Sequence, residues 1–528
     1  MISKTALYFF SAFLFATTCS AYSPSASYKR GKSPYYSKLT QCLTTGGVPY
    51  RVLTDQDWNE YATTFNARLV YTPAAIALPT TPEQVSSAVL CAAKHGFPVQ
   101  PKSGGHSYAS YSTGGVNGIL MVDLENLNTI SVDNTTGIAQ VGGGVRLGNL
   151  ALGIWDQGHR ALAHGTCPAV GIGGHFTHGG YGYSSRTFGL ALDQIVALDV
   201  VLANGSYIHA NNESYPEIYY ALRGAADSFG IVTTFHLQTS PAPPTVINFS
   251  FSFPDALSSP SAAADTFLAI QSVSLNSSII NRNSGFGVTI SNNATSYTLH
   301  GTYFGTMQEF SSTISPAFLN AIPYPPGNGS GTAVEETDWI TSLTLLGGAP
   351  TLQVPLHGYA ERDNFYAKSV TTAHPFTRAA LESFFAYALT EGKGEKAPVG
   401  WFSIINLYGG PDSQIGKAGR NSGGDSGEDE FAAYAGFDDL WVVQNYGNAG
   451  ANQTFPQEGI NFLDGLNDAM TSRMLGEYAA YLNYIDPGYT REEAFELYYG
   501  EPLFERLREL KRELDPGNVF RNPQSIPV

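Results

Sequence analysis

The sequence predicts an α+β protein with two domains, 22–243 and 244–475. Across the first range, helical and strand patterns follow one another without the regular βαβ alternation of a parallel doubly wound sheet. A proline-rich linker at 240–245 then opens a segment rich in Ser, Asn, Phe and Tyr, whose alternating apolar runs predict an antiparallel sheet with helices on one face. A chain of 528 residues can bury more than one core, and typical domain sizes favour two domains.

The elements of the first domain can be placed in order. Thr81-Pro82-Glu83-Gln84 is a capping box with proline at the first helical position, so a helix should begin here and stop at Gly96. Asn204-Gly205 predicts a type I′ hairpin turn between two β-rich runs. Strand patterns cover 97–100, 119–123, 138–141 and 194–203, and a helix pattern covers 147–157.

The second half continues with strand signals and ends in a helix. Alternating runs at 247–253 and 295–303 predict antiparallel strands. The stretch 417–430, rich in Gly, Ser and acidic residues, is typical of a mobile surface loop. From Pro502 onward, leucines at helical spacing predict an amphipathic helix that Asp515-Pro516-Gly517 ends. These leucines are Leu503, Leu507, Leu510 and Leu514.

The first 21 residues have the pattern of a secretory signal peptide. Lys4 precedes an apolar run at 6–16, and small residues at 19–21 close it. No later segment approaches the length of a membrane span, so we expect a soluble, secreted, extracellular protein. Asn-x-Ser/Thr sequons favour a glycoprotein in which most of these sites lie on the surface. They are Asn134, Asn204, Asn212, Asn248, Asn276, Asn293, Asn328 and Asn452.

Charge and cysteine content narrow the possibilities further. The formal net charge of −16, with no basic stripe, argues against binding to nucleic acid or to anionic membranes. Once the signal is removed, Cys42, Cys91 and Cys167 remain, which allows one disulfide. Cys42 and Cys91 lie outside the glycine-rich segments, so we predict that they pair and that Cys167 stays free.

Two glycine-rich segments carry the candidate chemistry: PKSGGHSYASYS at 101–112 and HGTCPAVGIGGHFTHGGYG at 164–182. A zinc site is one interpretation of the second, but its His and Cys residues lack paired ligand spacing, and we predict no metal. A dinucleotide fingerprint is disfavoured because GIGGHF lacks the third glycine. A purely structural glycine loop remains an alternative for either segment alone.

Considered together, the two segments favour a flavin. Both present glycine-rich backbone whose N–H groups can hold a pyrophosphate. Each also supplies one nucleophile, His106 or Cys167, and a flavin has two electrophilic positions near its benzenoid ring. A free thiol in a secreted protein would then have a use.

At this point the sequence resembles a known family. PKSGGHSYASY, GTCPAVGIGGHFTHGGYG, ALRGAADSFGIVT, YLNYID and the terminal LDPGNVFRNPQSIP are similar to motifs of the berberine-bridge-enzyme-like flavoproteins of the vanillyl-alcohol-oxidase fold, closest to fungal gluco- and chito-oligosaccharide oxidases. The resemblance implies a PCMH-type FAD-binding domain at 22–243, a substrate domain at 244–475, and a segment at 476–528 that returns to the FAD domain. It also implies a monomer that acts on a small molecule and O2.

The resemblance further implies bicovalent FAD. His106 would be linked to the flavin 8α carbon and Cys167 to C6, while Val170 would gate dioxygen and His175 would lie near the ribityl chain. The other implied cofactor-binding residues are Ser103, Gly104, Gly105, Ser107, Gly171, Gly174, Gly230, Ile231, Val232 and Asn483.

For catalysis, the resemblance implies Tyr484 as the base and Tyr108 as a second tyrosine beside it. Sugar-oxidising relatives carry an acid where IINLYGG has Asn406, and an amide can orient Tyr484 but cannot act as a carboxylate. Three further residues are predicted at the substrate: Trp401, Tyr408 and Gln444.

The sequence therefore predicts an oxidase that converts the anomeric hydroxyl of a mono- or oligosaccharide to a lactone, with hydride transfer to flavin N5 and release of H2O2. An aromatic alcohol or a secondary-metabolite intermediate is the alternative substrate. An inactive binding protein that retains the fold is a third interpretation, disfavoured by the presence of both linkage residues and Tyr484.

Overall fold

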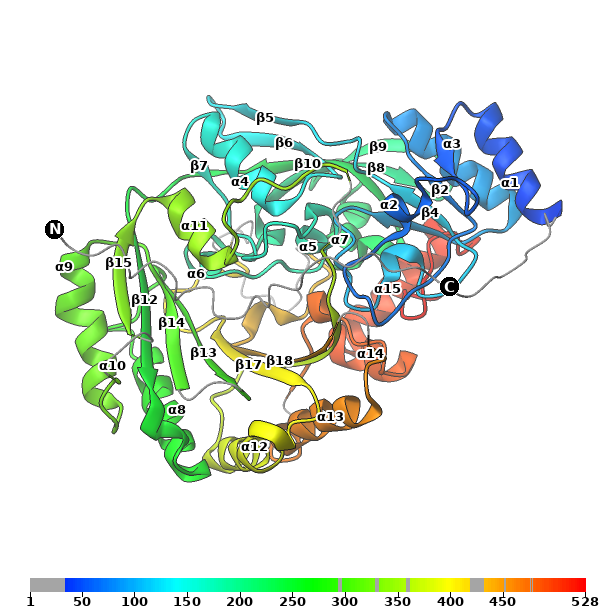
Figure 1. The fold of residues 1–528 in the computed structure, drawn as a ribbon. Helices are drawn as coiled ribbons and strands as arrows, with labels where there is room; N and C mark the ends of the chain where they lie inside the picture. Colours follow the sequence, from blue (N-terminus) through cyan, green and yellow to red (C-terminus); the bar gives the residue numbers. More distant parts are fainter. Residues whose placement is uncertain are drawn as a thin grey trace.

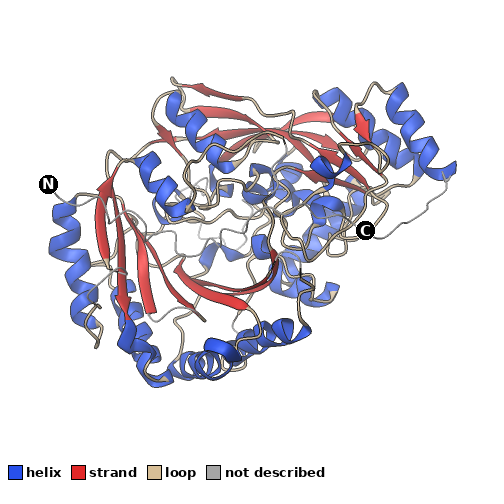
Figure 2. Cartoon of the chain, viewed as in Figure 1, coloured by secondary structure: helices blue, strands red, loops and turns tan. Residues whose placement is uncertain are grey.

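The computed structural model describes residues 34–292, 297–327, 332–357, 361–417, 432–450, 453–474, 476 and 478–528. The predicted signal peptide, most of the predicted loop at 417–430, and the sequons at Asn293, Asn328 and Asn452 lie outside these residues. Figures 1 and 2 show two sheet-containing layers, with the N-terminal strands in one and a large antiparallel sheet in the other.

A small sheet begins the N-terminal layer. Its strands follow the order β1-β2-β4-β3, and β2, β4 and β3 are mutually parallel while β1 is antiparallel. Apolar residues of α1 and α3 pack with these strands in one buried cluster. The elements are α1 (Pro34–Thr45), β1 (Tyr50–Arg51), β2 (Ala75–Ala77), α3 (Pro82–His95), β3 (Val99–Lys102) and β4 (Leu120–Asp123).

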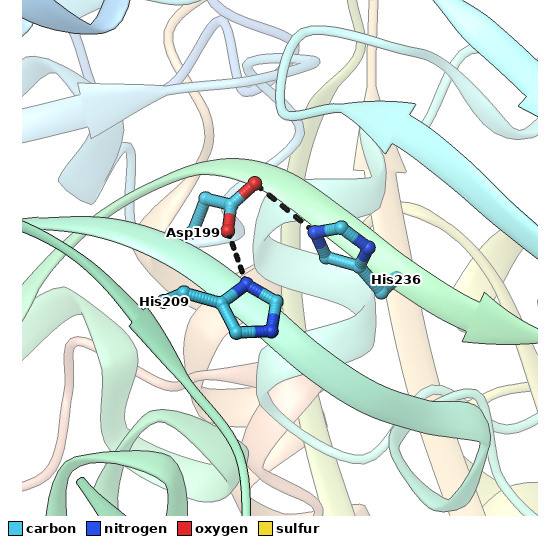
Figure 3. Close-up of side chains that lie close together, drawn as sticks. All are labelled: Asp199, His209 and His236. Carbon is cyan, nitrogen blue, oxygen red and sulfur yellow. Dashed lines mark hydrogen bonds and ion pairs between the residues drawn. The ribbon is translucent and has the colours of Figure 1, made fainter. Parts of the chain in front are cut away.

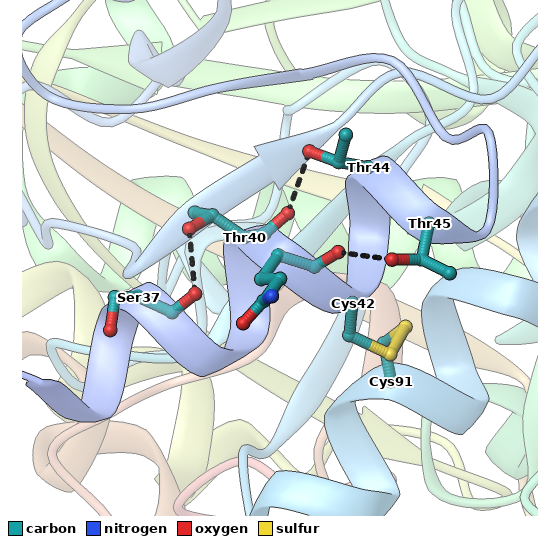
Figure 4. Close-up of a disulfide and its surroundings, with 7 residues drawn as sticks. Ser37, Thr40, Cys42, Thr44, Thr45 and Cys91 are labelled. Atoms are coloured by element: carbon teal, nitrogen blue, oxygen red, sulfur yellow. Dashed lines mark hydrogen bonds between the residues drawn. A yellow bond between two sulfur atoms is a disulfide. The ribbon is translucent and has the colours of Figure 1, made fainter.

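The predicted disulfide is confirmed: Cys42 of α1 and Cys91 of α3 are bonded, as Figure 4 shows. Cys167 is a free thiol, also as predicted. The helix α3 begins and ends where the sequence predicts, with Thr81 as its N-cap and Gly96 left-handed at its C-cap. The capping box is incomplete, however, because the Gln84 side chain accepts from the backbone of Thr80 instead of Thr81.

The second sheet of this layer has five antiparallel strands in the order β5-β6-β10-β8-β9. One face packs against α4, α5, α7 and the C-terminal helices through a large buried cluster. The elements are β5 (Ile130–Asp133), β6 (Ile138–Gly142), α4 (Leu147–Asp156), α5 (Ile172–Thr177), β8 (Ile195–Leu202), β9 (Tyr207–Ala210), α7 (Pro216–Ala225), β10 (Gly230–Gln238), α14 (Arg491–Tyr498) and α15 (Glu501–Leu514).

The hairpin between β8 and β9 is present, but its turn differs from the prediction. Gly205 donates its backbone N–H to Leu202 and has φ of 79°, whereas Asn204 is not among the residues with positive φ. A type I′ turn needs positive φ at both central residues, so this is a longer loop in which only Gly205 is left-handed. Asn204 remains exposed.

The other layer is a seven-stranded antiparallel sheet in the order β15-β12-β14-β13-β17-β18-β16. Helices α8, α12 and α13 cover its outer face, and the opposite face turns toward the N-terminal layer (Figure 1). The elements are β12 (Val246–Phe253), α8 (Pro260–Ser274), β13 (Ser284–Ser291), β14 (Tyr297–Tyr303), β15 (Ala333–Thr337), β16 (Asn364–Thr372), α12 (Arg378–Glu391), β17 (Gly400–Leu407), β18 (Trp441–Ala449) and α13 (Gln457–Thr471).

The remaining elements connect the layers. A two-stranded sheet pairs β7 (Arg160–Ala161) with β11 (Ser240–Pro241). The shorter helices are α2 (Trp58–Ala62), α6 (Ser185–Phe188), α9 (Met307–Glu309), α10 (Ser315–Ala321) and α11 (Trp339–Gly347). Within the part of the chain described, no helix has the length and apolar character needed to cross a membrane.

The described sequon asparagines include exposed residues and one buried residue. Asn134, Asn204, Asn212 and Asn276 are exposed. Asn248 is fully buried on β12, where its side chain donates to Thr337 and accepts from Ser342. A glycan cannot be attached there in the folded protein, so this sequon is a chance match.

Candidate active site

A cavity of about 420 Å³ lies where the two layers meet. Its walls come from both glycine-rich segments, from β17 and β18, and from the segment 481–485. Most of the predicted site residues line it, although they are far apart in the sequence. They are Ser103, Gly104, Gly105, His106, Ser107, Tyr108, Cys167, Val170, Gly171, Gly174, His175, Gly230, Val232, Asn406, Gln444, Asn483 and Tyr484.

The two glycine-rich segments touch each other at Gly104 and Gly171. A Cβ on either residue would overlap the backbone nitrogen of the other, so the approach requires glycine at both positions. Arg146 holds the junction, because its guanidinium donates to the backbone oxygens of Gly104 and Ala169 at 2.9 and 2.7 Å. The Ser103 hydroxyl adds a bond to Gly143 O at 2.6 Å. This contact brings the two predicted linkage residues to one cavity.

His106 and Cys167 both face this cavity. The imidazole of His106 stacks on Phe65, with 4.3 Å between ring centroids and 14° between planes. Burial, and then the charge of Arg146, lowers the pKa of His106 to about 3, so the ring is neutral and its nitrogen lone pair is retained. Burial raises the pKa of Cys167, partly opposed by backbone hydrogen bonds from Ala169 and Val170.

The histidines of the second segment are each engaged in local contacts. His175 accepts from Gly165 N at 2.8 Å, and burial lowers its pKa to about 3. His164 contacts the Gly165 carbonyl, and His178 contacts Gly174 O and Asp227. Among the described residues these side chains form no metal-binding group. These contacts hold the glycine-rich segment that forms one wall of the cavity.

Two tyrosines lie face to face in the cavity wall. Tyr108 and Tyr484 have ring centroids 5.3 Å apart and planes 13° apart. The Tyr108 hydroxyl accepts from the Gln444 amide at 2.7 Å. Burial, then the nearby Tyr108, raises the pKa of Tyr484 well above its usual value, so its phenol is neutral. Asn483 fixes the adjoining backbone by donating to the carbonyls of His175 and His178.

Asn406 lies on β17 opposite Gly287 of β13. Its Oδ1 is buried and has no hydrogen-bond partner in the described chain. A Cβ on Gly287 would overlap that oxygen, so glycine makes room for the amide. Among the described residues, no hydrogen bond joins Asn406 to Tyr484. The amide therefore offers an uncommitted acceptor to whatever enters the cavity.

Three predicted site residues do not line the cavity. Ile231 is fully buried on the face of β10 that packs against the small N-terminal sheet. Trp401 is buried in the core of the large sheet, where its indole N–H donates to Gly392 O. Tyr408 is buried and shares a hydrogen bond with Tyr434. Trp401 and Tyr408 are packing residues, so their predicted contact with a substrate is corrected. The predicted role of Ile231 at the cofactor stays a prediction, because its neighbours Gly230 and Val232 line the cavity.

The structure also adds residues that the sequence reasoning missed. Phe402 and Ile404 lie four and two residues before Asn406 on β17, and they line the cavity with it. Because every second residue of a strand points to the same face, the sequence could have predicted both from the position of Asn406. Tyr183 and Tyr446 also line the cavity, and Tyr446 donates to Asp363 at 2.6 Å. No local motif marks these two tyrosines, because their neighbours come from distant segments.

Comparisons with known proteins agree with this geometry. Family profiles described as "FAD binding domain" and "Berberine and berberine like" match residues 73–211 and 480–527. The xylooligosaccharide oxidase of Thermothelomyces thermophilus is 36% identical over 510 residues, covering 96% of this chain and 97% of that protein.

Solved structures extend the likeness to three dimensions. A xylooligosaccharide oxidase from Myceliophthora thermophila C1 in complex with xylobiose has a TM-score of 0.85 at 35% identity, covering 93% of this chain and 99% of that one. A glucooligosaccharide oxidase from Acremonium strictum, described with a 6-S-cysteinyl, 8α-N1-histidyl FAD, has a TM-score of 0.83 at 30% identity, with coverage of 93% and 99%. The predicted α+β fold class is confirmed.

Proposed function

Since this chain belongs to the berberine-bridge-enzyme-like family of FAD-dependent carbohydrate oxidoreductases, we propose that it is an oxidase with bicovalently bound FAD that converts the anomeric hydroxyl of a mono- or oligosaccharide to a lactone. The observation that carries the proposal is the single cavity shared by His106, Cys167, Tyr108 and Tyr484. Secretion is part of the proposal, because residues 1–21 have the signal pattern and the Cys42–Cys91 disulfide suits an oxidising compartment.

The residues present fit a flavin. The close approach at Gly104 and Gly171 leaves bare backbone on the cavity wall, which is what a pyrophosphate needs. His106 would hold the flavin through its 8α carbon, and its neutral ring supports a nucleophilic role. Cys167 would hold C6, and Val170, three residues later on the cavity wall, would gate dioxygen.

When bound, FAD would supply the hydride acceptor and would be reoxidised by O2, with release of H2O2. Tyr484 would take the proton of the substrate hydroxyl, since this residue lines the cavity and its own hydroxyl has no hydrogen-bond partner among the described residues. Gln444 would hold Tyr108 beside it through the 2.7 Å bond. Asn406 Oδ1 would accept from a neighbouring substrate hydroxyl, which meets the need of a buried acceptor.

A second candidate substrate, an aromatic alcohol or secondary-metabolite intermediate, is favoured by the β17 wall. Along this strand the cavity meets Phe402, Ile404 and Asn406, so two apolar side chains accompany one neutral polar group. Phe402 stacks on Tyr446 with centroids 5.0 Å apart, which makes a flat surface. A sugar can stack its C–H face there, and an aromatic ring fits equally well.

A peroxide-coupled screen of the purified holoprotein separates these substrates. Xylo-, gluco- and chito-oligosaccharides should give H2O2 and the matching lactone or aldonic acid if the first proposal holds. Turnover of aromatic alcohols with no turnover of any sugar would support the second. Absence of bound flavin after expression with excess riboflavin would contradict both.

A further inference from the structure

Three side chains far from the cavity form a cluster of metal-ligand type. Asp199 of β8, His209 of β9 and His236 of β10 come from three adjacent strands of the five-stranded sheet, and they point toward one another (Figure 3). Asp199 and His209 are direct cross-strand partners, and His236 lies two residues beyond Thr234, the partner of Asp199 on the other side. Strand pairing therefore fixes the three on one sheet face.

The distances in the cluster suit a small cation. Asp199 Oδ1 is 2.6 Å from His209 Nδ1, and Asp199 Oδ2 is 3.0 Å from His236 Nε2. The three ligand atoms all lie within 4.8 Å of one another. Zinc bonds of about 2.0–2.2 Å place neighbouring tetrahedral ligands roughly 3.3 Å apart. An ion would therefore need the 2.6 Å contact to open by roughly 0.7 Å and the 3.0 Å contact by roughly 0.3 Å.

An ion can reach the cluster from solvent. The His209 side chain is 50% exposed, while those of Asp199 and His236 are 18% and 16% exposed, so the cluster opens to solvent on one side. Two imidazoles and one carboxylate leave a fourth position for water, a ligand set typical of Zn2+ and related divalent ions. No other such group occurs among the residues that the structure describes.

We propose that Asp199, His209 and His236 bind a divalent transition-metal ion of the Zn2+ type, which clamps the edge strand β9 to β8 and β10. β9 is an edge strand of its sheet, so the ion would cross-link a strand that pairs on one side only. β10 also begins with Gly230, which lines the cavity. None of the three ligands lines that cavity, so the site is independent of the proposed oxidase chemistry.

The test uses the holoprotein after chelator treatment and removal of the chelator, titrated with Zn2+ and with Co2+. Wild-type protein should bind one equivalent, show visible Co2+ absorption bands, and unfold at a higher temperature with Zn2+ present. Loss of a residue that only hydrogen-bonds to a metal ligand lowers metal affinity roughly 10–100-fold. Loss of a direct ligand should cost at least as much, so Asp199→Asn, His209→Gln and His236→Gln should each weaken binding by at least about tenfold.

His357→Gln is the matched control. His357 is also exposed and pairs with one carboxylate, Glu125, at 2.8 Å, and no third ligand joins this pair among the residues that the structure describes. This variant should bind Zn2+ like wild type. Circular dichroism shows whether each variant is folded, and the conservative His209→Cys, which keeps a zinc ligand, should retain tighter binding than His209→Gln. Zn2+ affinity unchanged by all three ligand substitutions, or no saturable binding by wild type, would overturn the proposal.

Discussion

Tyr108 lies parallel to Tyr484 in the cavity wall, with ring centroids 5.3 Å apart. The two hydroxyls have different roles available to them. That of Tyr108 is committed to Gln444 at 2.7 Å, whereas that of Tyr484 has no partner among the described residues. This difference supports the proposal that Tyr108 orients its neighbour and that Tyr484 exchanges a proton with the substrate.

Tyr484→Phe should consequently slow flavin reduction. The change removes the proton acceptor and keeps the ring that stacks on Tyr108, so we expect a loss of about 10²- to 10⁴-fold, the usual contribution of a positioned base. Anaerobic stopped-flow absorbance with the best substrate measures it. Tyr108→Phe is the comparison and should cost less. Flavin reduction by Tyr484→Phe at nearly the wild-type rate would show that the base lies elsewhere.

Variants of the two proposed linkage residues should differ in how much flavin they retain. Cys167→Ala should keep the flavin on the acid-precipitated protein through His106, and His106→Ala should keep it through Cys167. Only the double variant should release all of it, because each single change leaves one covalent bond. Absorbance of the precipitate and mass spectrometry of tryptic peptides measure this. Complete release from the wild-type protein would contradict bicovalent attachment. The Cys167→Ala enzyme should also have a lower flavin potential.

Asn406 provides a test of the substrate. Asn406→Asp keeps the shape of the side chain over Gly287 and adds a carboxylate, so sugar oxidation should be kept or raised if the enzyme is a sugar oxidase. Asn406→Leu has a similar size but no acceptor, and it should raise KM for a sugar because a substrate hydroxyl loses its partner. Steady-state kinetics with both variants measure these effects. Sugar oxidation abolished by Asn406→Asp and an aromatic alcohol still oxidised would favour the second substrate class.

The disulfide should stabilise the N-terminal layer. Cys42 and Cys91 are 49 residues apart, and a loop of that length is worth roughly 4 kcal/mol in the chain-entropy description. The double variant Cys42→Ala/Cys91→Ala should unfold at a lower temperature in differential scanning fluorimetry. Cys167→Ala serves as the control for loss of a thiol that is not bridged. An unchanged unfolding temperature in the double variant would contradict this contribution.

Much of this structure follows from local sequence, and one error has a simple geometric cause. Thr81 and Gly96 bound their helix as predicted, and the proposed linkage residues share one cavity because glycine allows their segments to touch. Trp401 lies outside the cavity because it belongs to a strand, where neighbouring side chains point to opposite faces. Counting in twos from Asn406 toward the start of the strand selects Ile404 and Phe402 and excludes Trp401. The same count reaches Tyr408, but β17 ends at Leu407, and Tyr408 packs in another cluster beside Tyr434.

Other features could not be predicted from one chain segment. The stacking of Phe65 on His106 joins residues of separate segments through the fold alone. The order of the seven-stranded sheet, in which β13 lies beside β17, likewise depends on tertiary packing. The cluster of Asp199, His209 and His236 exists only after three strands have paired in register. Long-range pairing of this kind leaves no local pattern to read.

The stability of the folded protein should depend on pH through Asp439. Burial, with the neighbouring Asp438 adding to it, raises the pKa of Asp439 to about 7, from an ordinary value of 3.8. Between these two values the folded protein keeps a proton that the unfolded chain has released. The unfolded state therefore binds fewer protons, and stability should fall as pH rises through this window, by up to about 1.4 kcal/mol per pH unit.

Asp439→Asn removes this titration while keeping the shape of the side chain. Relative to wild type, the variant should gain stability steadily as pH rises from about 4 to about 7, and the gain should level off above that range because the folded carboxyl is then ionised. Unfolding midpoints measured across this pH series give the difference directly. Asp438→Asn makes the same chemical change at the exposed neighbouring residue and should show no such trend. A difference between Asp439→Asn and wild type that does not vary with pH would contradict a protonated Asp439 in the folded protein.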